Sequence, residues 1–277
     1  YDRYRIWGRK DIKAQLEKFH DQEIVKEFTQ AVEEKRITEL YWCGGEPLMW
    51  KIHWEAMQRI IELGYQDQVL ARYNSNMSRI QYFKYNLFDD ILQYYPNFQI
   101  CASIDGTGEV GEYIRTGLKY KQWLENIRYG LKFVKTKHQR MQLDLTITLP
   151  GLFDLENMVH LSNDLNIELL TKQVFNFTND NAMAPLFMPY DIMSEIIDDA
   201  RSKTIKYKNP HLKNFFNQLD EMQSQKRNNE LIYSEEEYKI GQKKGKAEVE
   251  RLDKIRKTDI KKILAKNKKA LEWWTSI

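Results

Sequence analysis

Apolar residues recur along the first two thirds of the chain in short runs that alternate with segments of helical spacing. The runs predict five β-strands, within residues 37–42, 69–73, 98–104, 143–149 and 167–177. Apolar residues spaced by three or four predict helices near residues 24–32, 52–63, 83–92, 123–134, 155–165 and 192–197. Strands and helices that alternate at these lengths predict an α/β protein with a parallel sheet and right-handed crossover connections.

Several residues mark where these elements begin and end. Asp21 and Asp154 are expected N-caps, Gly64 is expected to follow a helix end, and Pro96 is expected to stop a helix. The helix near residues 24–32 has no strand before it, although a βα repeat would place one there. Since the sequence also begins with Tyr1 rather than methionine, we expect the first strand to lie upstream of this chain.

The pattern changes in the last third of the chain. From residue 203 the sequence is mostly polar with few strand signals, and residues 241–270 are rich in lysine. We therefore expect two parts, an α/β part at residues 1–200 and a helical, lysine-rich extension at residues 201–277. Trp273 and Trp274 near its end are expected to pack this extension onto the α/β part.

Composition and charge narrow the classes of protein. No stretch approaches the roughly 20 apolar residues of a membrane helix, and no signal peptide is visible, so we expect a cytoplasmic protein without a membrane partner. A net charge of +3 does not by itself indicate a nucleic-acid partner, although the lysine-rich extension leaves an anionic partner open.

Cysteine and histidine give no sign of a metal site. Cys43 comes directly after one predicted strand and Cys101 falls within another, and we expect both to be small buried apolar side chains in a reducing compartment. No ligand spacing links the five histidines, which are expected to have surface or packing roles: His20, His53, His138, His160 and His211.

Small polar or charged residues follow four of the predicted strands. In chain order they are Gly44, Gly45, Glu46 and Pro47, then Ser75 and Asn76, then Ser103, Asp105 and Arg115, and last Thr148. The carboxyl ends of parallel strands meet at one edge of the sheet, where active sites of α/β barrels lie. Glycines allow a ligand to approach the backbone, a carboxylate binds an amine, and a guanidinium binds an anion. The sequence therefore predicts a binding site at this edge.

These residues carry a family resemblance. The Gly44-Gly45-Glu46-Pro47 run resembles the GGEP motif of radical S-adenosylmethionine (SAM) enzymes, and Ser75-Asn76 lies where that family often has a Thr-Asn-Gly turn. Residues 103–106, followed by Tyr113-Ile114-Arg115 and Gly117, resemble a pattern of the branch with a twitch or SPASM extension. The resemblance covers residues 37–177. It implies a partial (β/α)6 TIM-like barrel, here without its first strand.

The resemblance also implies roles for the site residues. Gly44, Gly45 and Glu46 would hold the amino group of the SAM methionine, and Ser103 and Arg115 would hold its carboxylate. Ser75, Asn76 and Asp105 would lie near the ribose or shape the pocket. Thr148 and the backbone near Val174 would lie near the ribose and adenine.

The expected cofactors are SAM and, only in a full-length protein, a [4Fe-4S] cluster. The family's cluster needs three thiolates, usually in a C-x3-C-x2-C loop, and this chain has two cysteines. The cluster reduces SAM to a 5′-deoxyadenosyl radical that abstracts a hydrogen atom from the substrate. The resemblance therefore implies that this chain alone is inactive.

Three functions remain open from the sequence. The first is the SAM-binding barrel of a radical SAM enzyme that modifies a peptide, protein or other macromolecule and receives electrons from a donor. The second is a non-catalytic binding module of the same fold that holds a partner with its basic tail. The third is an unrelated α/β-barrel enzyme that uses Glu46, Asp105 and Arg115 as acid–base and anion-binding groups.

Overall fold

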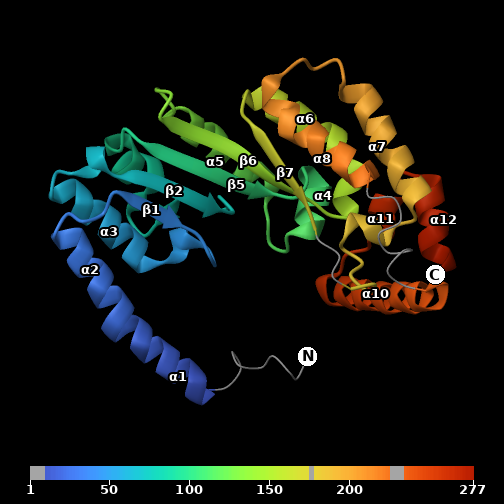
Figure 1. Cartoon of the computed structure of the whole chain (residues 1–277), viewed down its shortest axis with the longest axis horizontal. Helices are drawn as coiled ribbons and strands as arrows, with labels where there is room; N and C mark the ends of the chain where they lie inside the picture. Colours follow the sequence, from blue (N-terminus) through green and yellow to red (C-terminus); the bar gives the residue numbers. More distant parts are fainter. Residues whose placement is uncertain (1–9, 175–177, 225–233) are drawn as a thin grey trace. The chain divides into compact units, whose positions relative to one another are not determined.

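The computed structural model describes residues 10–174, 178–224 and 234–277 (Figure 1). Five strands form one sheet in the order β1-β2-β5-β6-β7. They are β1 (Glu39–Trp42), β2 (Leu70–Ser75), β5 (Phe98–Ile104), β6 (Gln139–Ile147) and β7 (Leu169–Gln173). β1 runs parallel to β2, and β6 runs parallel to β7. The predicted α/β class with a parallel sheet is thus confirmed.

Each predicted strand is present. Where the predicted and observed ends of a strand agree or differ, the burial of its side chains explains why. β5 matches its predicted range because every second residue from Phe98 to Ile104 is fully or almost fully buried. β6 begins earlier than predicted, because Gln139 looks polar in the sequence but is buried and donates its side-chain amide to the carbonyl of Tyr95 at 3.1 Å. Residues 175–177 of the last predicted range lie outside the described residues.

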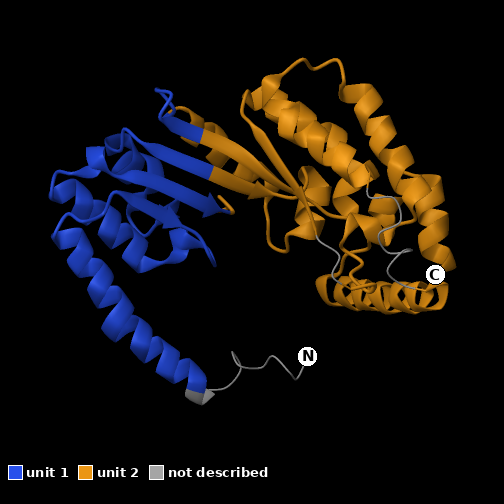
Figure 2. Ribbon diagram, in the orientation of Figure 1, with its two compact units in different colours: residues 1–75, 79–100, 133–140 blue, residues 76–78, 101–132, 141–277 orange. Residues whose placement is uncertain are grey.

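The chain divides into two compact units (Figure 2). Unit 1 comprises residues 1–75, 79–100 and 133–140, and unit 2 comprises residues 76–78, 101–132 and 141–277. This division does not follow the expected boundary near residue 200, since the C-terminal helices share unit 2 with residues 101–132 and 141–200. Each unit is described by itself below.

Unit 1 contains α1 (Lys10–Phe19), α2 (Val25–Glu33) and α3 (Lys51–Glu62). A π-helical turn, His20–Ile24, joins α1 to α2, so Asp21 lies inside a helical run. The expected N-cap at Asp21 is therefore wrong, because residues 10–19 contain neither glycine nor proline and continue the helix upstream. Gly64 follows α3 with a φ of +70°, as predicted for a residue after a helix end.

The predicted helix near residues 83–92 is also wrong. A hairpin of β3 (Gln81–Tyr82) and β4 (Tyr85–Asn86) occupies its first half, and short π-helical and 3-10 turns follow at Leu87–Ile91 and Leu92–Tyr94. Phe83 is 90% exposed with a φ of +52°, so it lies at the hairpin tip. The apolar spacing from residue 87 onward does mark a buried face, but one only a helical turn long.

Unit 2 contains eight described helices: α4 (Gly108–Ile114), α5 (Tyr120–Leu131), α6 (Leu155–Leu165), α7 (Tyr190–Thr204), α8 (Lys213–Ser224), α10 (Glu235–Arg256), α11 (Lys261–Leu264) and α12 (Lys268–Ser276). Within this unit α6 packs on α7, α7 packs on α8, and α8 packs on β7 (Figure 1). The described residues after 201 lie in helices and the turns between them, while residues 225–233 are outside the described residues.

The largest fully buried side chains of each unit are mainly aromatic. Trp54, Tyr73 and Phe88 are almost completely buried in unit 1, as are Trp123 and Trp274 in unit 2. In the part of the chain that the structure describes, we find no helix with both the length and the apolar composition required to cross a membrane.

Candidate functional site

The Gly44-Gly45-Glu46-Pro47 turn lies directly after β1 in unit 1. Gly44 has a φ of +100°, which favours glycine, and Pro47 begins a short 3-10 turn. A Glu46 carboxylate oxygen accepts hydrogen bonds from the hydroxyl of Ser75 at 2.7 Å and from the backbone amide of Leu48 at 3.3 Å. The parallel register that places Trp42 opposite Tyr73 brings these two strand ends together. Two predicted site residues thus meet.

A cavity of about 490 Å³ lies beside this turn within unit 1. Gly45, Glu46 and Pro47 line it together with aromatic side chains, among them Trp42 and Trp50. An apolar wall beside a carboxylate is the composition expected of a small-molecule pocket. The GGEP-like turn therefore faces a space that a ligand could occupy.

The two cysteines are less buried than predicted. Cys43 is exposed, because burial alternates along β1 and residue 43 falls on its exposed face. Cys101 is half-buried on β5, where its sulfur accepts a hydrogen bond from the Gln142 side chain at 3.0 Å. The expectation that both are buried apolar side chains is wrong, since it rested on strand position without the facing direction.

Asp105 and Arg115 form the centre of the second group, in unit 2. The Arg115 guanidinium donates two hydrogen bonds to the Asp105 carboxylate, from Nε at 2.7 Å and from Nη2 at 3.0 Å. Asp105 follows β5 and is 8% exposed, while Arg115 follows α4 and is partly exposed. A two-point contact of this kind fixes the plane and direction of a guanidinium.

The remaining predicted residues also belong to unit 2. Ser103 is half-buried on β5, and Asn76 accepts a hydrogen bond from the Ser78 amide at 2.8 Å. Thr148 is buried, and its hydroxyl oxygen accepts a hydrogen bond from the Gly151 amide at 3.0 Å. Val174 donates its amide to the carbonyl of Ile147 at 2.9 Å. Thr148 therefore has a structural hydrogen bond.

Glycines hold the backbone close together around Asp105. A β-carbon added at Gly111 would lie 2.1 Å from the carbonyl oxygen of Gly106. One added at Gly151 would lie 2.9 Å from the carbonyl oxygen of Asp105 and 3.0 Å from the Thr148 hydroxyl oxygen. Side chains larger than hydrogen therefore do not fit where α4 and the residues after β6 pack against the Asp105 turn.

We expect Gly111→Ala to lower the free energy of unfolding of unit 2 by about 1–3 kcal/mol, because backbone atoms must move to admit the methyl group. Urea denaturation followed by circular dichroism measures this loss. Glu109→Ala in the same helix is the matched control, since Glu109 is exposed and its change should stay within about 0.5 kcal/mol. Equal stability of Gly111→Ala and Glu109→Ala would show that this contact relaxes without cost.

Asp154 was predicted from the sequence as a helix N-cap, but its side chain binds the turn that follows Asp105. It occupies the N-cap position of α6 but makes no side-chain hydrogen bond to the amides of that helix. Its carboxylate instead accepts hydrogen bonds from the backbone amide of Thr107 and from the Asn157 side chain at 2.7 Å. Burial raises the pKa of Asp154, and these hydrogen bonds oppose that rise only in part. Asp154 therefore ties the start of α6 to the turn after Asp105.

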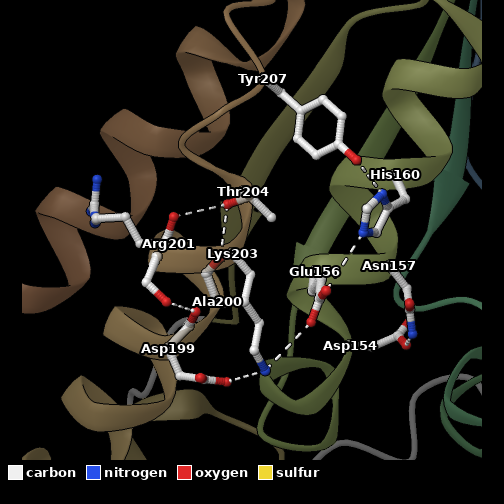
Figure 3. Close-up of polar contacts among 11 residues, drawn as sticks. Asp154, Glu156, Asn157, His160, Asp199, Ala200, Arg201, Lys203, Thr204 and Tyr207 are labelled. Carbon is white, nitrogen blue, oxygen red and sulfur yellow. Dashed lines mark hydrogen bonds and ion pairs between the residues drawn. The ribbon is translucent and has the colours of Figure 1, made fainter.

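A second polar cluster joins α6 to α7 (Figure 3). Lys203 lies 2.6 Å from a carboxylate oxygen of Asp199 and 3.5 Å from one of Glu156. Glu156 also lies 3.5 Å from His160, whose other ring nitrogen is 2.8 Å from the Tyr207 hydroxyl. A cavity of about 570 Å³ is lined by Glu156, Asp199 and Lys203 among others. The charges in this cluster are paired, so it braces the two helices.

Sequence reasoning missed this cluster because charged residues on amphipathic helices are ordinarily solvated. Asp199 and Lys203 are four residues apart on α7, a common spacing for an exposed helical ion pair. Only the packing of α6 on α7 brings Glu156 to the same lysine.

The residues that the structure describes do not suit a metal ion or an iron–sulfur cluster, but they do suit parts of SAM. Among the described residues, no group of three or more histidine, cysteine, aspartate or glutamate side chains could hold a metal ion. The two cysteines of the chain also cannot supply the three thiolates of a [4Fe-4S] site. The donor set does suit parts of SAM, because Glu46 offers an oriented carboxylate to an ammonium and Arg115 offers an oriented guanidinium to a carboxylate.

A scan against protein-family models finds no match to the chain. A search of curated proteins finds no similar sequence. Neither comparison shows a family, and the function is therefore inferred from the chain's own residues.

Proposed function

We propose that this chain is the SAM-binding part of a radical SAM enzyme, of the branch with a twitch or SPASM extension. Its fold would then be a partial (β/α)6 TIM-like barrel. The order of the strands in the sheet supports this fold. The order is β1-β2-β5-β6-β7, so each strand lies beside the sheet strand that comes next along the chain. Doubly wound sheets reverse their order at a switch point, whereas barrel strands follow one another around the barrel.

The observation that carries the proposal is the hydrogen bond between Glu46 and Ser75. It joins the GGEP-like turn after β1 to the end of β2, at the edge of the sheet where barrel sites lie. Ser75 and the Leu48 amide both donate to the same oxygen of Glu46, which holds the carboxylate in one orientation. A fixed carboxylate beside a glycine turn is suited to the ammonium of the SAM methionine.

In unit 2, Arg115 is the proposed partner of the SAM carboxylate. Guanidinium has five N–H donors, and the two bonds to Asp105 leave further donors for a ligand. Asp105 would then act as a positioning residue that orients Arg115. Ser103 on β5 would assist in holding the carboxylate, and Thr148 and Asn76 would shape the pocket.

The iron–sulfur cluster is not part of what we propose for this chain by itself. In the family, the cluster supplies the electron that cleaves SAM. This chain lacks the three thiolates, so its own residues account for binding and orienting SAM and do not account for cleaving it. The proposed reaction of the complete enzyme is hydrogen abstraction from a macromolecular substrate.

Titration calorimetry of the chain with SAM tests the proposal. We expect Glu46→Ala and Arg115→Ala each to weaken SAM binding at least about tenfold, since each removes a charged hydrogen-bonding partner. Glu55→Ala and Arg201→Ala are matched controls, because both residues form exposed or partly exposed ion pairs on other helices, and they should leave affinity unchanged.

The same measurement decides between the proposal and its alternative. Wild-type chain that does not bind SAM, or binding that survives both site substitutions, would contradict the proposal. The absence of SAM binding would favour the enzyme of another class that uses Glu46, Asp105 and Arg115 for acid–base and anion-binding chemistry.

A further inference from the structure

Positive charge is concentrated in one segment of the chain. Residues 239–269 contain 13 lysines or arginines and four aspartates or glutamates, a net charge of +9. The whole chain carries +3, so the remaining residues are net acidic. Segregation of charge on this scale creates a strong local positive potential despite the small net charge.

The packing of α10 directs this charge outward. Its buried residues recur at helical spacing and are Gly241, Gln242, Gly245, Val249 and Asp253. A β-carbon on Gly241 would lie 2.5 Å from the carbonyl oxygen of Asn179, and one on Gly245 would lie 2.6 Å from that of Asp180. The two glycines therefore let the helix approach this loop closely, and Lys243, Lys244 and Lys254 are left exposed.

Asp253 fixes the turn that follows α10. Its carboxylate accepts hydrogen bonds from the Thr258 hydroxyl at 2.6 Å and from the Ile260 amide at 2.8 Å. Lys257 takes the left-handed conformation at the end of the helix, with a φ of +58°. A turn held in this way keeps exposed Lys257, Lys261 and Lys262 in fixed positions after the helix.

We define the basic ridge as six exposed lysines of α10, of the turn after it and of the start of α11: Lys243, Lys244, Lys254, Lys257, Lys261 and Lys262. Within the described parts of the chain, none of these six forms an ion pair. Other cations nearby are paired, such as Arg251 with Glu248 and Lys269 with Glu195. The ridge lysines are therefore available to an external anion.

The surroundings of the ridge favour one kind of anionic partner. The first turn of α10 is acidic, with Glu235, Glu236 and Glu237, so the basic part of the helix is residues 243–254. These residues span about 18 Å at 1.5 Å per residue, a length over which a duplex presents several phosphates. The exposed large apolar residues of α10 are Ile240 and Ile255, near opposite ends of the helix, so a continuous apolar face for lipid is absent from this described element. The aromatic residue of α10 is Tyr238, which is half-buried and donates its hydroxyl to the carbonyl of Phe187. A side chain held in this way is poorly placed to stack on the bases of a single strand.

We infer that the basic ridge binds the phosphate backbone of a nucleic-acid duplex. Lysine ammonium groups on a rigid helix and turn supply charge without base-edge recognition, so binding is independent of sequence and sensitive to salt. The ridge contains none of the residues proposed for SAM. Within unit 2 the ridge lies near Arg115, because Asp253 at the base of the ridge is close enough to the half-buried Tyr113, two residues before Arg115, to raise its pKa after the larger effect of burial.

Fluorescence anisotropy with the full chain tests this inference. Labelled RNA and DNA duplexes of about 20 base pairs are titrated between about 50 and 200 mM salt, beside a single strand of the same length. We expect either duplex to bind more tightly than the single strand. The triple variant Lys243→Glu, Lys254→Glu, Lys261→Glu should bind at least about tenfold more weakly, with a salt slope smaller by about 2–3.

A second triple variant with the same change of charge is the control. Lys121→Glu, Lys137→Glu and Lys208→Glu alter exposed lysines that are not part of the ridge, and this variant should keep duplex affinity within about threefold of wild type. Circular dichroism checks that both variants fold. Equal losses in the two variants, no duplex binding at low salt, or tighter binding to polyglutamate or to anionic lipid vesicles would each overturn the inference.

Discussion

We expect Trp274→Ala to lower the free energy of unfolding of unit 2 by about 3–5 kcal/mol, the range for removing a fully buried tryptophan. Trp274 in α12 is completely buried, with its ring centroid 6.4 Å from that of Phe187 and 5.8 Å from that of Trp273. Phe187 also contacts α10, where its ring would lie 2.9 Å from a β-carbon on Gly245. Loss of the indole thus leaves a cavity where two C-terminal helices meet.

Chemical denaturation followed by circular dichroism measures this loss, and two further variants locate its cause. Trp274→Phe should cost less than about 1.5 kcal/mol, because it keeps an aromatic ring and removes an indole N–H that has no hydrogen-bond partner among the described residues. Trp273→Ala should cost less than Trp274→Ala, since Trp273 is only half-buried. A Trp274→Ala protein as stable as wild type would show that α12 does not depend on this contact.

We expect unit 1 to lose stability in mild acid because of His53. This histidine is fully buried, and burial lowers its pKa from 6.5 to about 3. Trp42, Trp54 and Tyr73 surround the ring, whose Nε2 lies 3.0 Å from the Tyr73 hydroxyl. Such an apolar and aromatic environment does not compensate an imidazolium charge.

The direction of the effect follows from proton binding. Since the pKa is lower in the folded state, the unfolded state binds the proton first as pH falls below 6.5, and stability declines until pH approaches 3. The contribution amounts to about 1.4 kcal/mol per pH unit, or roughly 3 kcal/mol between neutral pH and about pH 4. Above pH 6.5 the group has no effect on stability.

Urea denaturation followed by tryptophan fluorescence, at a series of pH values, measures this contribution, because Trp42 and Trp54 report on the same unit. His53→Gln retains a hydrogen-bonding side chain next to Tyr73 and should reduce the fall in the free energy of unfolding between pH 6.5 and about pH 4. His138→Gln is the control at an exposed histidine and should follow wild type. If the free energy of unfolding of His53→Gln falls as steeply with decreasing pH as that of wild type, the loss of stability comes from other groups.

The positions of the sheet strands along the chain could be predicted from the sequence. Strands β1, β2, β5, β6 and β7 are all where short apolar runs predict them, because a strand buried on one or both faces must carry those runs. Residues 83–92 show the limit of this signal. Their apolar spacing fits a helix, yet Phe83 lies exposed at a hairpin tip, and the buried apolar face that begins at residue 87 continues for one helical turn only.

The candidate site was predictable as a set of residues but not as a set of contacts. The sequence named Glu46, Ser75, Asp105 and Arg115 because each follows a predicted strand or the turn after it. The bonds from Ser75 to Glu46 and from Arg115 to Asp105 depend on strand register and on how α4 packs, and neither is a local property. The bond from the Thr107 amide to Asp154 is of the same kind, since it joins residues 47 positions apart.

By itself the sequence determined the class of fold, the positions of the sheet strands along the chain, the polar residues at their ends and the concentration of lysine after residue 239, because periodicity and composition are local properties of a chain. Tertiary structure alone decided that Cys43 is exposed, that His53 is buried and uncharged at neutral pH, and that Gly241 and Gly245 bring α10 against a loop. Each of these depends on which distant residues lie nearby, because solvation and close packing are set by neighbours in space.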